Sequence, residues 1–355
     1  MSDKTSSQSS PNSESPPVRI LGIETSCDET AAAVVENGRV ILSSVVASQV
    51  DLHAQFGGVF PEVASRQHIK AIYPIIEQAL QKAHLSLAEI DGIAVTRGPG
   101  LPGSLVIGMN AAKGIALARG LPLVGINHLE GHLYSAWLYE TEAEPSPEPV
   151  FPLVALIVSG GHTELVLMHD HLTYQRLGAT QDDAAGEAFD KVARLVDLPY
   201  PGGPSIQKAS QDGNPLAIKY PRAWLEGSWN FSFSGLKTAV LRDVRQRQQF
   251  QTSLPVADIA AGFQAAVVDV LVSKTMQAAK EFKVKSVLVA GGVSANRALR
   301  QSFQLRVSTP LYIPPLSLCT DNAAMIAGAG YYRFARGQRD GLDMDVLPNW
   351  PLSEL

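Results

Sequence analysis

Cysteine is scarce in this chain of 355 residues, which holds only Cys27 and Cys319, near opposite ends. A disulfide framework is therefore not expected, and a reducing compartment suits the chain. Long apolar runs are also missing, since none reaches the roughly 18–20 residues that a membrane span needs. Residues 1–17 are rich in Ser and Pro, without the apolar segment of a secretory signal or the Arg-rich, acid-poor composition of a transit peptide. We expect a cytoplasmic protein with a disordered tail over residues 1–17.

An excess of positive charge is also absent, because the formal net charge is −5. This balance argues against a protein that coats nucleic acid, although it leaves room for a local basic patch. Apolar residues make up 45% of the chain and charged residues 18%, which favours a well-filled core over disorder. The length suits two domains or lobes.

Predicted strands alternate with predicted helices in both halves, which indicates an α/β protein. A strand, a small polar turn and a second strand occur near residue 19 and again near residue 153, which suggests a weak internal duplication. Residues 140–150 (ETEAEPSPEPV) are acidic and proline-rich, as in a linker loop. We expect an N-terminal lobe over residues 18–139, a C-terminal lobe with a helical insertion over 151–338, and a C-terminal tail over 339–355.

The predicted helix over residues 103–118 is unusual because it holds many small residues, among them Gly108 and Ala112. Small residues on one face let another backbone approach closely. One hypothesis is that this face docks a helix of a partner protein, with the apolar helix over residues 61–83 beside it. The alternative is that both helices cover the sheet of the N-terminal lobe.

Three turns that follow predicted strands combine Gly, Ser and Thr, and so could meet a phosphate or nucleotide. Such turns expose backbone N–H groups, and glycine lets the chain approach an anion closely. A single turn of this kind is weak evidence, but three in one α/β chain favour nucleotide binding. The three turns span residues 25–28 (TSCD), 159–162 (SGGH) and 291–294 (GGVS).

His128 and His132 are four residues apart, which on a helix turns both imidazoles to one face and within reach of one metal ion. A third ligand should come from elsewhere, and Asp321 is the candidate, at the predicted N-cap of a small-residue helix. The alternative is that both histidines are hydrogen-bonded or exposed and that Asp321 only caps. A zinc-protease motif needs Glu directly after the first His, but Leu129 stands there and Glu130 follows, so proteolysis is not expected.

Two charged segments have open interpretations. Asp183, Glu187 and Asp190 would share one helical face, which is either solvated or, given the small residues around it, part of a site. Asp190 is the candidate for hydroxyl recognition. The basic run from Lys237 to Arg247 follows two phenylalanines, which suits either RNA contact or a solvated helix. The basic residues are Lys237, Arg242, Arg245 and Arg247.

Taken together, these segments closely resemble the tRNA threonylcarbamoyladenosine transferase (TsaD) family, whose members were once labelled glycoprotein endopeptidases. The resemblance runs in unbroken order from about Val18 to about Gly337. It implies a two-lobed actin/Hsp70/sugar-kinase-like fold with a duplicated core. The matching motifs are residues 22–30 (GIETSCDET), 128–132 (HLEGH), 158–163 (VSGGHT), 182–191 (DDAAGEAFDK), 200–204 (YPGGP), 231–237 (FSFSGLK), 290–296 (AGGVSAN) and 319–322 (CTDN).

The resemblance also implies an activity, namely transfer of threonylcarbamoyl from threonylcarbamoyl-adenylate to the exocyclic amine of adenosine 37 in tRNAs that read ANN codons. AMP would be released. It implies as partners a paralogous, TsaB-like subunit and a small, TsaE-like ATPase. The implied metal ligands, for iron or alternatively zinc, are His128, His132 and Asp321. The residue implied near the transferred group is Asp28, and the implied adenylate-binding positions are Ile157, Val158, Ser159, Gly160, Gly161, Asp190, Gly203 and Asn296.

Two other functions share some of these features. A small-molecule kinase of the same fold would use the phosphate turns but has no need of a histidine pair. A nucleotide-switched scaffold without catalysis would need neither the pair nor a transferred group. Metal analysis and a transfer assay with labelled threonine distinguish the three.

Overall fold

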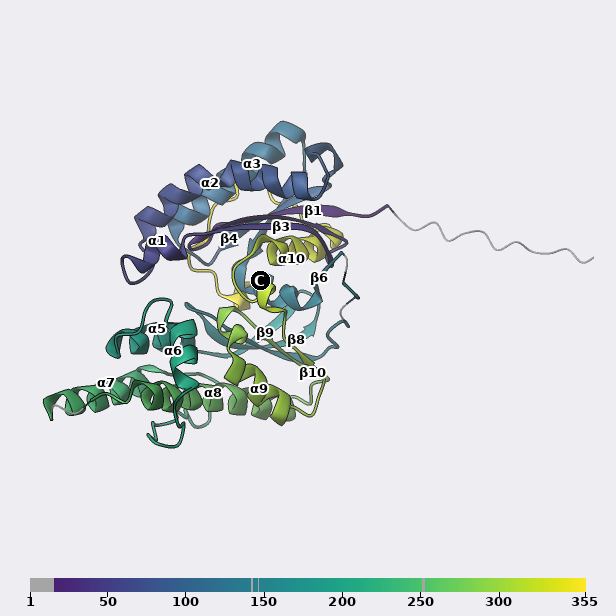
Figure 1. Ribbon diagram of the computed structural model, residues 1–355. Coiled ribbons are helices and arrows are strands. Elements are labelled where there is room, and N and C mark those ends of the chain that lie inside the picture. Colours follow the sequence, from purple (N-terminus) through teal and green to yellow (C-terminus); the bar gives the residue numbers. More distant parts are fainter. Residues whose placement is uncertain (1–15, 142, 146, 251–252) are drawn as a thin grey trace, which may run out of the picture.

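A computed structural model describes residues 16–141, 143–145, 147–250 and 253–355 of the chain. The tail predicted over residues 1–17 therefore lies almost wholly outside the described residues. Two β-sheets lie one above the other, with helices between them and on both outer faces (Figure 1). Both cysteines are free, as the sequence predicts.

The first sheet has six strands in the order β5-β4-β1-β2-β3-β6. Strands β1, β2 and β3 pair antiparallel, whereas β4 and β5 continue from β1 in parallel. Strands β1 and β4 are buried along nearly their whole length, as expected for strands covered on both faces. The strands are β1 (Arg19–Glu24), β2 (Glu29–Glu36), β3 (Val40–Ser48), β4 (Gly92–Gly98), β5 (Leu123–Asn127) and β6 (Tyr139–Glu140).

The second sheet has five strands in the order β11-β10-β7-β8-β9. Its antiparallel β7, β8 and β9, with parallel β10 and β11 on the other side of β7, repeat the order of the first five strands of the first sheet. The predicted duplication is therefore confirmed at the level of topology. The strands are β7 (Leu153–Val158), β8 (Thr163–Asp170), β9 (Thr173–Ala179), β10 (Ser286–Ala290) and β11 (Leu311–Tyr312).

Two helices, α4 (His128–Tyr134) and α10 (Ala323–Ala335), lie between the sheets. Small residues permit the close packing of α10 on the first sheet. A Cβ on Gly22 would lie 2.3 Å from the carbonyl oxygen of Ala323, and one on Gly330 would lie 2.4 Å from the Cβ of Ala94. Although α10 follows the second sheet in the chain, it packs on the first sheet.

A buried ion pair ties these two middle helices to the second sheet. Arg333 of α10 donates to Glu130 of α4 through Nε (2.7 Å) and Nη2 (2.9 Å), and Tyr174 of β9 donates its hydroxyl to the same carboxylate at 2.7 Å. Glu130 is wholly buried. Its carboxylate thus has a structural role, which agrees with the sequence argument against proteolysis.

The outer layers differ in size. On the first sheet lie α2 (Pro61–Lys82) and α3 (Pro102–Arg119), joined to β3 by the short α1 (Val50–Ala54). The second sheet carries a larger helical layer. Its helices are α5 (Ala185–Leu195), α6 (Gly202–Ser210), α7 (Ser234–Gln249), α8 (Val256–Glu281) and α9 (Arg297–Arg306).

Helix α8 is long and apolar enough to cross a membrane by composition, which the search for apolar runs did not anticipate. However, 67% of its most apolar window is buried inside the protein. Its apolar residues, such as Phe263 and Leu271, form the centre of the core beneath the second sheet. The apolar character of α8 is therefore explained by this core.

The small face of α3 points inward. Gly108 and Ala112 are buried, and a Cβ on Gly108 would lie 2.4 Å from the Oγ1 of Thr25. The hypothesis that these two residues face a partner protein is wrong, because they bring α3 close to the turn after β1.

The C-terminal segment returns to the first sheet. Asp340 forms a bridge with Leu123 of β5, the backbone N–H of Leu347 donates to the carbonyl of Arg97 at 2.8 Å, and the guanidinium of Arg97 lies over the ring of Trp350. The predicted boundaries at residues 140–150 and 338 stay predictions. In space, α10 and the segment after it add to the first half of the molecule.

Candidate metal and nucleotide site

The first part of the site is built on helix α4, which begins where β5 ends. The Asn127 side chain caps this helix by accepting from the N–H groups of Leu129 (2.9 Å) and Glu130 (3.4 Å). The other end of the Asn127 amide donates to the carbonyl of Trp350 at 2.9 Å. The cap thus fixes where α4 starts, and the four-residue spacing turns the rings of His128 and His132 to one side, with centroids 4.7 Å apart.

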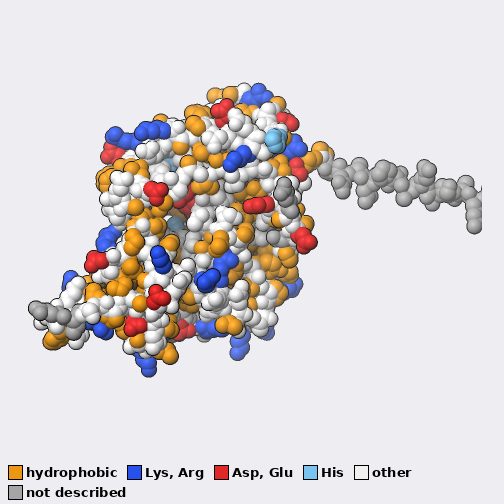
Figure 2. All heavy atoms as spheres, viewed as in Figure 1, with side chains coloured by type: hydrophobic (Ala, Val, Ile, Leu, Met, Phe, Trp, Pro, Cys, Tyr) orange, Lys and Arg blue, Asp and Glu red, His pale blue; other side chains and the backbone are white. Residues whose placement is uncertain are grey.

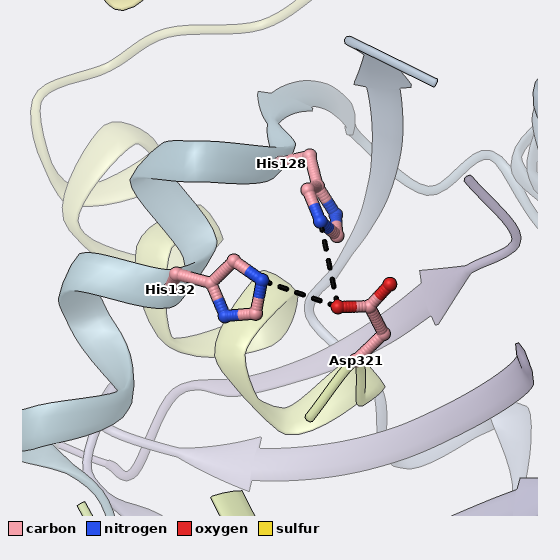
Figure 3. A group of neighbouring side chains, drawn as sticks. All are labelled: His128, His132 and Asp321. Carbon is pink, nitrogen blue, oxygen red and sulfur yellow. Dashed lines mark ion pairs between the residues drawn. The ribbon is translucent and has the colours of Figure 1, made fainter. Parts of the chain in front are cut away.

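Asp321 approaches the two imidazoles from the loop before α10 (Figure 3). The predicted capping role of Asp321 is wrong, because the N-cap of α10 is Asn322, whose side chain accepts from the N–H of Met325 at 3.0 Å. Asp321 lies one residue earlier, and its Oδ1 reaches Nε2 of His132 at 3.1 Å and Nε2 of His128 at 3.5 Å. Because Asp321 does not cap α10, its carboxylate is available as a metal ligand.

These three side chains suit a divalent transition metal. Their ligand atoms all lie within 4.8 Å of one another, and two imidazoles with one carboxylate are a donor set that zinc and iron accept. His132 is wholly buried, and among the described residues neither of its ring nitrogens has a hydrogen-bond partner, even though Nε2 is close to Asp321. An unpartnered buried nitrogen is costly, and a cation between the three groups would remove that cost for Nε2.

Glu24, at the end of β1, lies behind His128. Its Oε2 is 3.1 Å from Nδ1 of His128 and accepts from the hydroxyl of Thr96 at 2.6 Å. A carboxylate at Nδ1 favours a proton there and leaves Nε2 free for a metal, as is usual for metal-bound histidine. The sequence analysis missed Glu24, although a lone acidic residue in the apolar run RILGIE is a recognisable signal.

Electrostatics within the site are strong because the groups are buried. Burial alone would lower the pKa of His128, but the carboxylates of Asp321 and Glu24 outweigh it and raise that pKa to about 9. Burial would raise the pKa of Asp321, yet the charges of His128 and His132 hold it well below its usual range. Without a metal ion, the imidazole of His128 therefore stays in its protonated, charged form at neutral pH. A metal ion that binds this ring must displace a proton.

The second part of the site is a cavity of about 220 Å³ at the second sheet. Of the eight adenylate positions implied by the resemblance, four line it, namely Gly160, Asp190, Gly203 and Asn296. Ile157 and Val158 are buried strand residues of β7, and the hydroxyl of Ser159 accepts from the N–H of His162 at 3.1 Å. The other lining residues are Gly186, Phe189, Pro204, Gln207, Gly292, Val293 and Ala295.

Two glycines shape the wall of this cavity. A Cβ on Gly186 would lie 2.6 Å from the carbonyl oxygen of Ser159, so only glycine lets α5 come this close to the turn over residues 159–162. Gly291 has a φ of +91°, and a Cβ there would lie 2.5 Å from the carbonyl oxygen of Val158. Gly186 and Gly291 therefore let α5 and the turn over residues 291–294 approach the end of β7 closely beside the cavity.

Two polar side chains that line the cavity are held in place by hydrogen bonds to neighbouring residues. Asp190 accepts from the N–H of Gly202 at 2.7 Å, which links α5 to α6. Asn296 caps α9 by accepting from the N–H of Leu299 at 3.0 Å, while its amide nitrogen donates to Gln264 at 2.8 Å. Gln264 is a neighbour that the sequence analysis missed, and its place inside the apolar α8 gives little local signal.

Asp28 lies in the turn between β1 and β2 and is 8% exposed. Burial together with the charges of Asp321 and Asp28 raises the pKa of the neighbouring Glu29 to about 9, so Glu29 is protonated at neutral pH. The charge of Asp321, a candidate metal ligand, thus acts on the residues at the turn over residues 25–28.

The acidic segment around Asp183 and the basic run that begins at Lys237 contact each other through an ion pair. Asp183 precedes α5 rather than forming its face, and it pairs with Lys191 (2.7 Å) and Lys237 (2.6 Å). Phe231 and Phe233 are buried in the core. The hypothesis of an RNA surface there is therefore wrong for the two phenylalanines. It stays a prediction for the basic run, in which Lys237 is paired and Arg242 and Arg245 on α7 are exposed.

Two sheets with one shared strand order and matching turns define the actin/Hsp70/sugar-kinase-like class of folds. Solved structures of the same fold include HypF of T. kodakarensis (TM-score 0.60, 14% identity, 91% of this chain and 50% of that one). Component A of the (R)-2-hydroxyglutaryl-CoA dehydratase of Acidaminococcus fermentans also matches (TM-score 0.51, 16% identity, 90% and 99%). These likenesses concern the fold alone.

Sequence comparisons identify the family within this class. Residues 40–328 match the family model described as TsaD, tRNA N6-adenosine threonylcarbamoyltransferase. Transferases of that name are 57% identical in Dehalococcoides mccartyi (93% of this chain, 98% of the relative) and 54% identical in Bacillus subtilis (96% and 98%). The chain belongs to the tRNA N6-adenosine threonylcarbamoyltransferase family, and it is a tRNA-modifying transferase.

Proposed function

We propose that the donor is threonylcarbamoyl-adenylate and that the acceptor is the exocyclic amine of adenosine 37 in tRNAs that read ANN codons. The observation that carries this proposal is the turn over residues 159–162. Gly160 at one side of this turn lines the cavity. Burial, together with the charges of His128 and His132, lowers the pKa of His162 at its other end to about 4. One turn thus connects the cavity with the three candidate metal ligands.

In this proposal the cavity holds the adenylate part of the donor. Asp190 accepts hydrogen bonds from the ribose hydroxyls, Asn296 contacts the nucleoside, and the backbone around Gly160 faces the phosphate. His128, His132 and Asp321 hold one metal ion, iron or alternatively zinc. When bound, the ion supplies Lewis-acid polarisation of the carbamoyl carbonyl.

The reaction needs no covalent intermediate with the protein, because the donor is already an activated mixed anhydride. The amine nitrogen bonds to the carbamoyl carbon, the bond from that carbon to the phosphate oxygen breaks, and AMP leaves with the electron pair. In this proposal Asp28 accepts a hydrogen bond from the amine and takes the proton that the nitrogen loses. An adenine amine is a weak nucleophile, so positioning should supply much of the rate.

Replacing Asp190 by alanine should weaken binding of a non-hydrolysable adenylate analogue at least about tenfold, since a hydrogen bond to a charged group contributes about 1.5–3 kcal/mol. Asn296→Ala should act in the same direction and should also lose the cap of α9. Isothermal calorimetry measures both affinities. Glu187→Ala, on the same helix but outside the cavity, is the control and should bind the analogue normally. Unchanged affinity in both site variants would exclude this placement of the adenylate.

We further propose that the chain works with a paralogous, TsaB-like subunit and a small, TsaE-like ATPase in the cytoplasm, where its two free thiols suit a reducing environment. On the face shown in Figure 2, cationic and anionic side chains are interspersed without a large area of one sign. Affinity for a polyanion then has to come from local contacts or from another subunit.

The outer face of α2 and α3 is the proposed contact with the paralogous subunit. It exposes four large apolar residues at helical spacing, Ile69 and Tyr73 on α2 and Val106 and Leu117 on α3. The two helices pack side by side. Large apolar side chains exposed at this spacing on two neighbouring helices suit a protein contact.

The pair Tyr73→Glu and Leu117→Glu should leave the chain folded but prevent complex formation, because two charges would be buried in the contact. Size-exclusion chromatography with the partner subunits measures the complex, and labelled threonine measures its transfer to unmodified tRNA. Gly108→Arg, which points at Thr25, should instead unfold the chain, and Leu305→Glu on α9 should change neither property. Full transfer activity of the isolated wild-type chain would contradict the partner proposal.

A further inference from the structure

The loop between α1 and α2, residues 55–60 (QFGGVF), presents an aromatic pair to solvent. Phe56 is 56% exposed and Phe60 is 48% exposed, and their ring centroids lie 5.7 Å apart with an interplanar angle of 33°. Neither ring belongs to a core cluster of the first sheet. Two adjacent exposed rings on one short loop are a surface that a flat partner can cover.

The loop that carries this aromatic pair touches α5, the helix that also contributes Asp190 to the proposed adenylate cavity. Arg194 of α5 donates through Nη2 to the carbonyl of Gly57, so the loop of the first half touches the helix of the second half. Arg194 is one helical turn after Asp190, which lines the cavity. Figure 1 shows α1 and α5 on the same side of the molecule. The rings therefore lie on a loop of the first half that touches α5 of the second half.

The loop is also anchored to the turn that carries Asp28. His53 is wholly buried, and its Nδ1 accepts from the N–H of Phe60 at 3.2 Å, while its Nε2 is 3.2 Å from the side-chain oxygen of Gln49. The N–H of Gln49 in turn donates to the carbonyl of Asp28 at 3.1 Å. The backbone that carries the rings is thus held at a defined distance from the proposed site of transfer.

The acceptor chemistry requires a device of this kind. An adenine within an RNA loop stacks on its neighbours and must leave that stack before its amine can reach a group held in a cleft. Proteins that read unpaired RNA commonly receive the separated bases on aromatic side chains, and arginine contacts the phosphates. The exposed guanidinium of Arg194 places positive charge next to the rings.

We propose that Phe56 and Phe60 form a stacking platform for the bases that flank the acceptor adenosine, with Arg194 beside it contacting the RNA backbone. This inference rests on the proposed function, because it assumes that the acceptor enters between α1 and α5. It assigns the anticodon loop of the tRNA, rather than a protein, to this surface.

The test uses a fluorescent anticodon stem-loop RNA with an unmodified acceptor adenosine and the full-length, metal-loaded chain, with and without its partner subunits. Phe56→Ala and Phe60→Ala should each weaken RNA binding about tenfold, the loss expected for one base–aromatic stack. Phe56→Tyr and Phe60→Tyr should bind normally, because they keep the ring. The dependence of affinity on salt should stay unchanged in the alanine variants, since no phosphate contact is lost.

Three controls separate this role from others. Leu305→Ala on α9 removes an equally exposed apolar side chain (87% exposed) and should leave RNA affinity unchanged. A blunt RNA duplex should bind all variants equally, because it offers no unpaired bases. Affinity for the adenylate analogue should not change, so a failure of the proposed donor site would be seen independently of the RNA result.

Normal affinity of the double alanine variant for the stem-loop would overturn the proposal. So would equal weakening for stem-loop and duplex, or loss of the complex with the partner subunits while RNA affinity stays normal. The last result would assign the two rings to a protein contact.

Discussion

Replacing His132 by alanine should remove nearly all bound metal and lower the rate of threonylcarbamoyl transfer by at least about 1,000-fold, since Lewis-acid assistance contributes several kcal/mol. His132 is the most informative ligand to replace, because within the described part of the chain its ring nitrogens have no hydrogen-bond partner, although Nε2 lies 3.1 Å from Oδ1 of Asp321. Truncation therefore removes a ligand and leaves the contact between Glu24 and His128 in place. Elemental analysis of the purified protein gives the metal content, and labelled threonine gives the rate.

The matched control is His171→Ala, which removes an imidazole that stacks on Tyr332 at 4.1 Å, outside the cluster. This variant should keep its metal. Wild-type metal content in His132→Ala would refute the ligand assignment. Loss of metal with unchanged transfer would show that the ion is not part of the reaction.

Glu130→Ala should lower the free energy of unfolding by about 3–5 kcal/mol, the usual cost of removing one partner from a buried ion pair. The substitution would leave the Arg333 guanidinium buried without its carboxylate and the Tyr174 hydroxyl without its acceptor. Urea denaturation followed by circular dichroism measures the change. A second substitution, Arg333→Ala, should recover part of the loss, because the uncompensated charge is then gone.

An exposed ion pair provides the comparison. Glu62→Ala breaks the pair with Arg66 on α2, in which both side chains are mostly exposed, and should cost at most about 1 kcal/mol. If Glu130→Ala proved equally mild while abolishing activity, Glu130 would have to be assigned to catalysis instead of to packing.

Features governed by local spacing could be predicted from the sequence. The strand predicted near residue 153 is β7 (Leu153–Val158), because it is a fully buried run followed by turn residues. The histidine pair on α4 was predicted because four residues make about one helical turn. The turns over residues 159–162 and 291–294 were found for the same reason, since a strand followed by Gly and Ser leaves few conformations.

Features governed by contacts between distant segments could not be predicted. Thr320, Asp321 and Asn322 are all plausible helix caps, and only the approach of α4 decides that Asp321 points to the histidines while Asn322 caps. The inward direction of Gly108 depends on Thr25, 83 positions earlier. The burial of Phe231 and Phe233 depends likewise on the core beneath the second sheet, which no local pattern reveals.

The return of the chain to its first sheet has a consequence for biosynthesis. The ribosome releases β1 to β5 long before α10 and Trp350, yet the inner face of that sheet and the cap of α4 are completed only by these late residues. The first half therefore completes its packing only after these late residues have emerged, and its contacts join residues far apart in the sequence, which slows folding. Asp321 emerges with the same late segment, so the three candidate metal ligands can come together only late in synthesis.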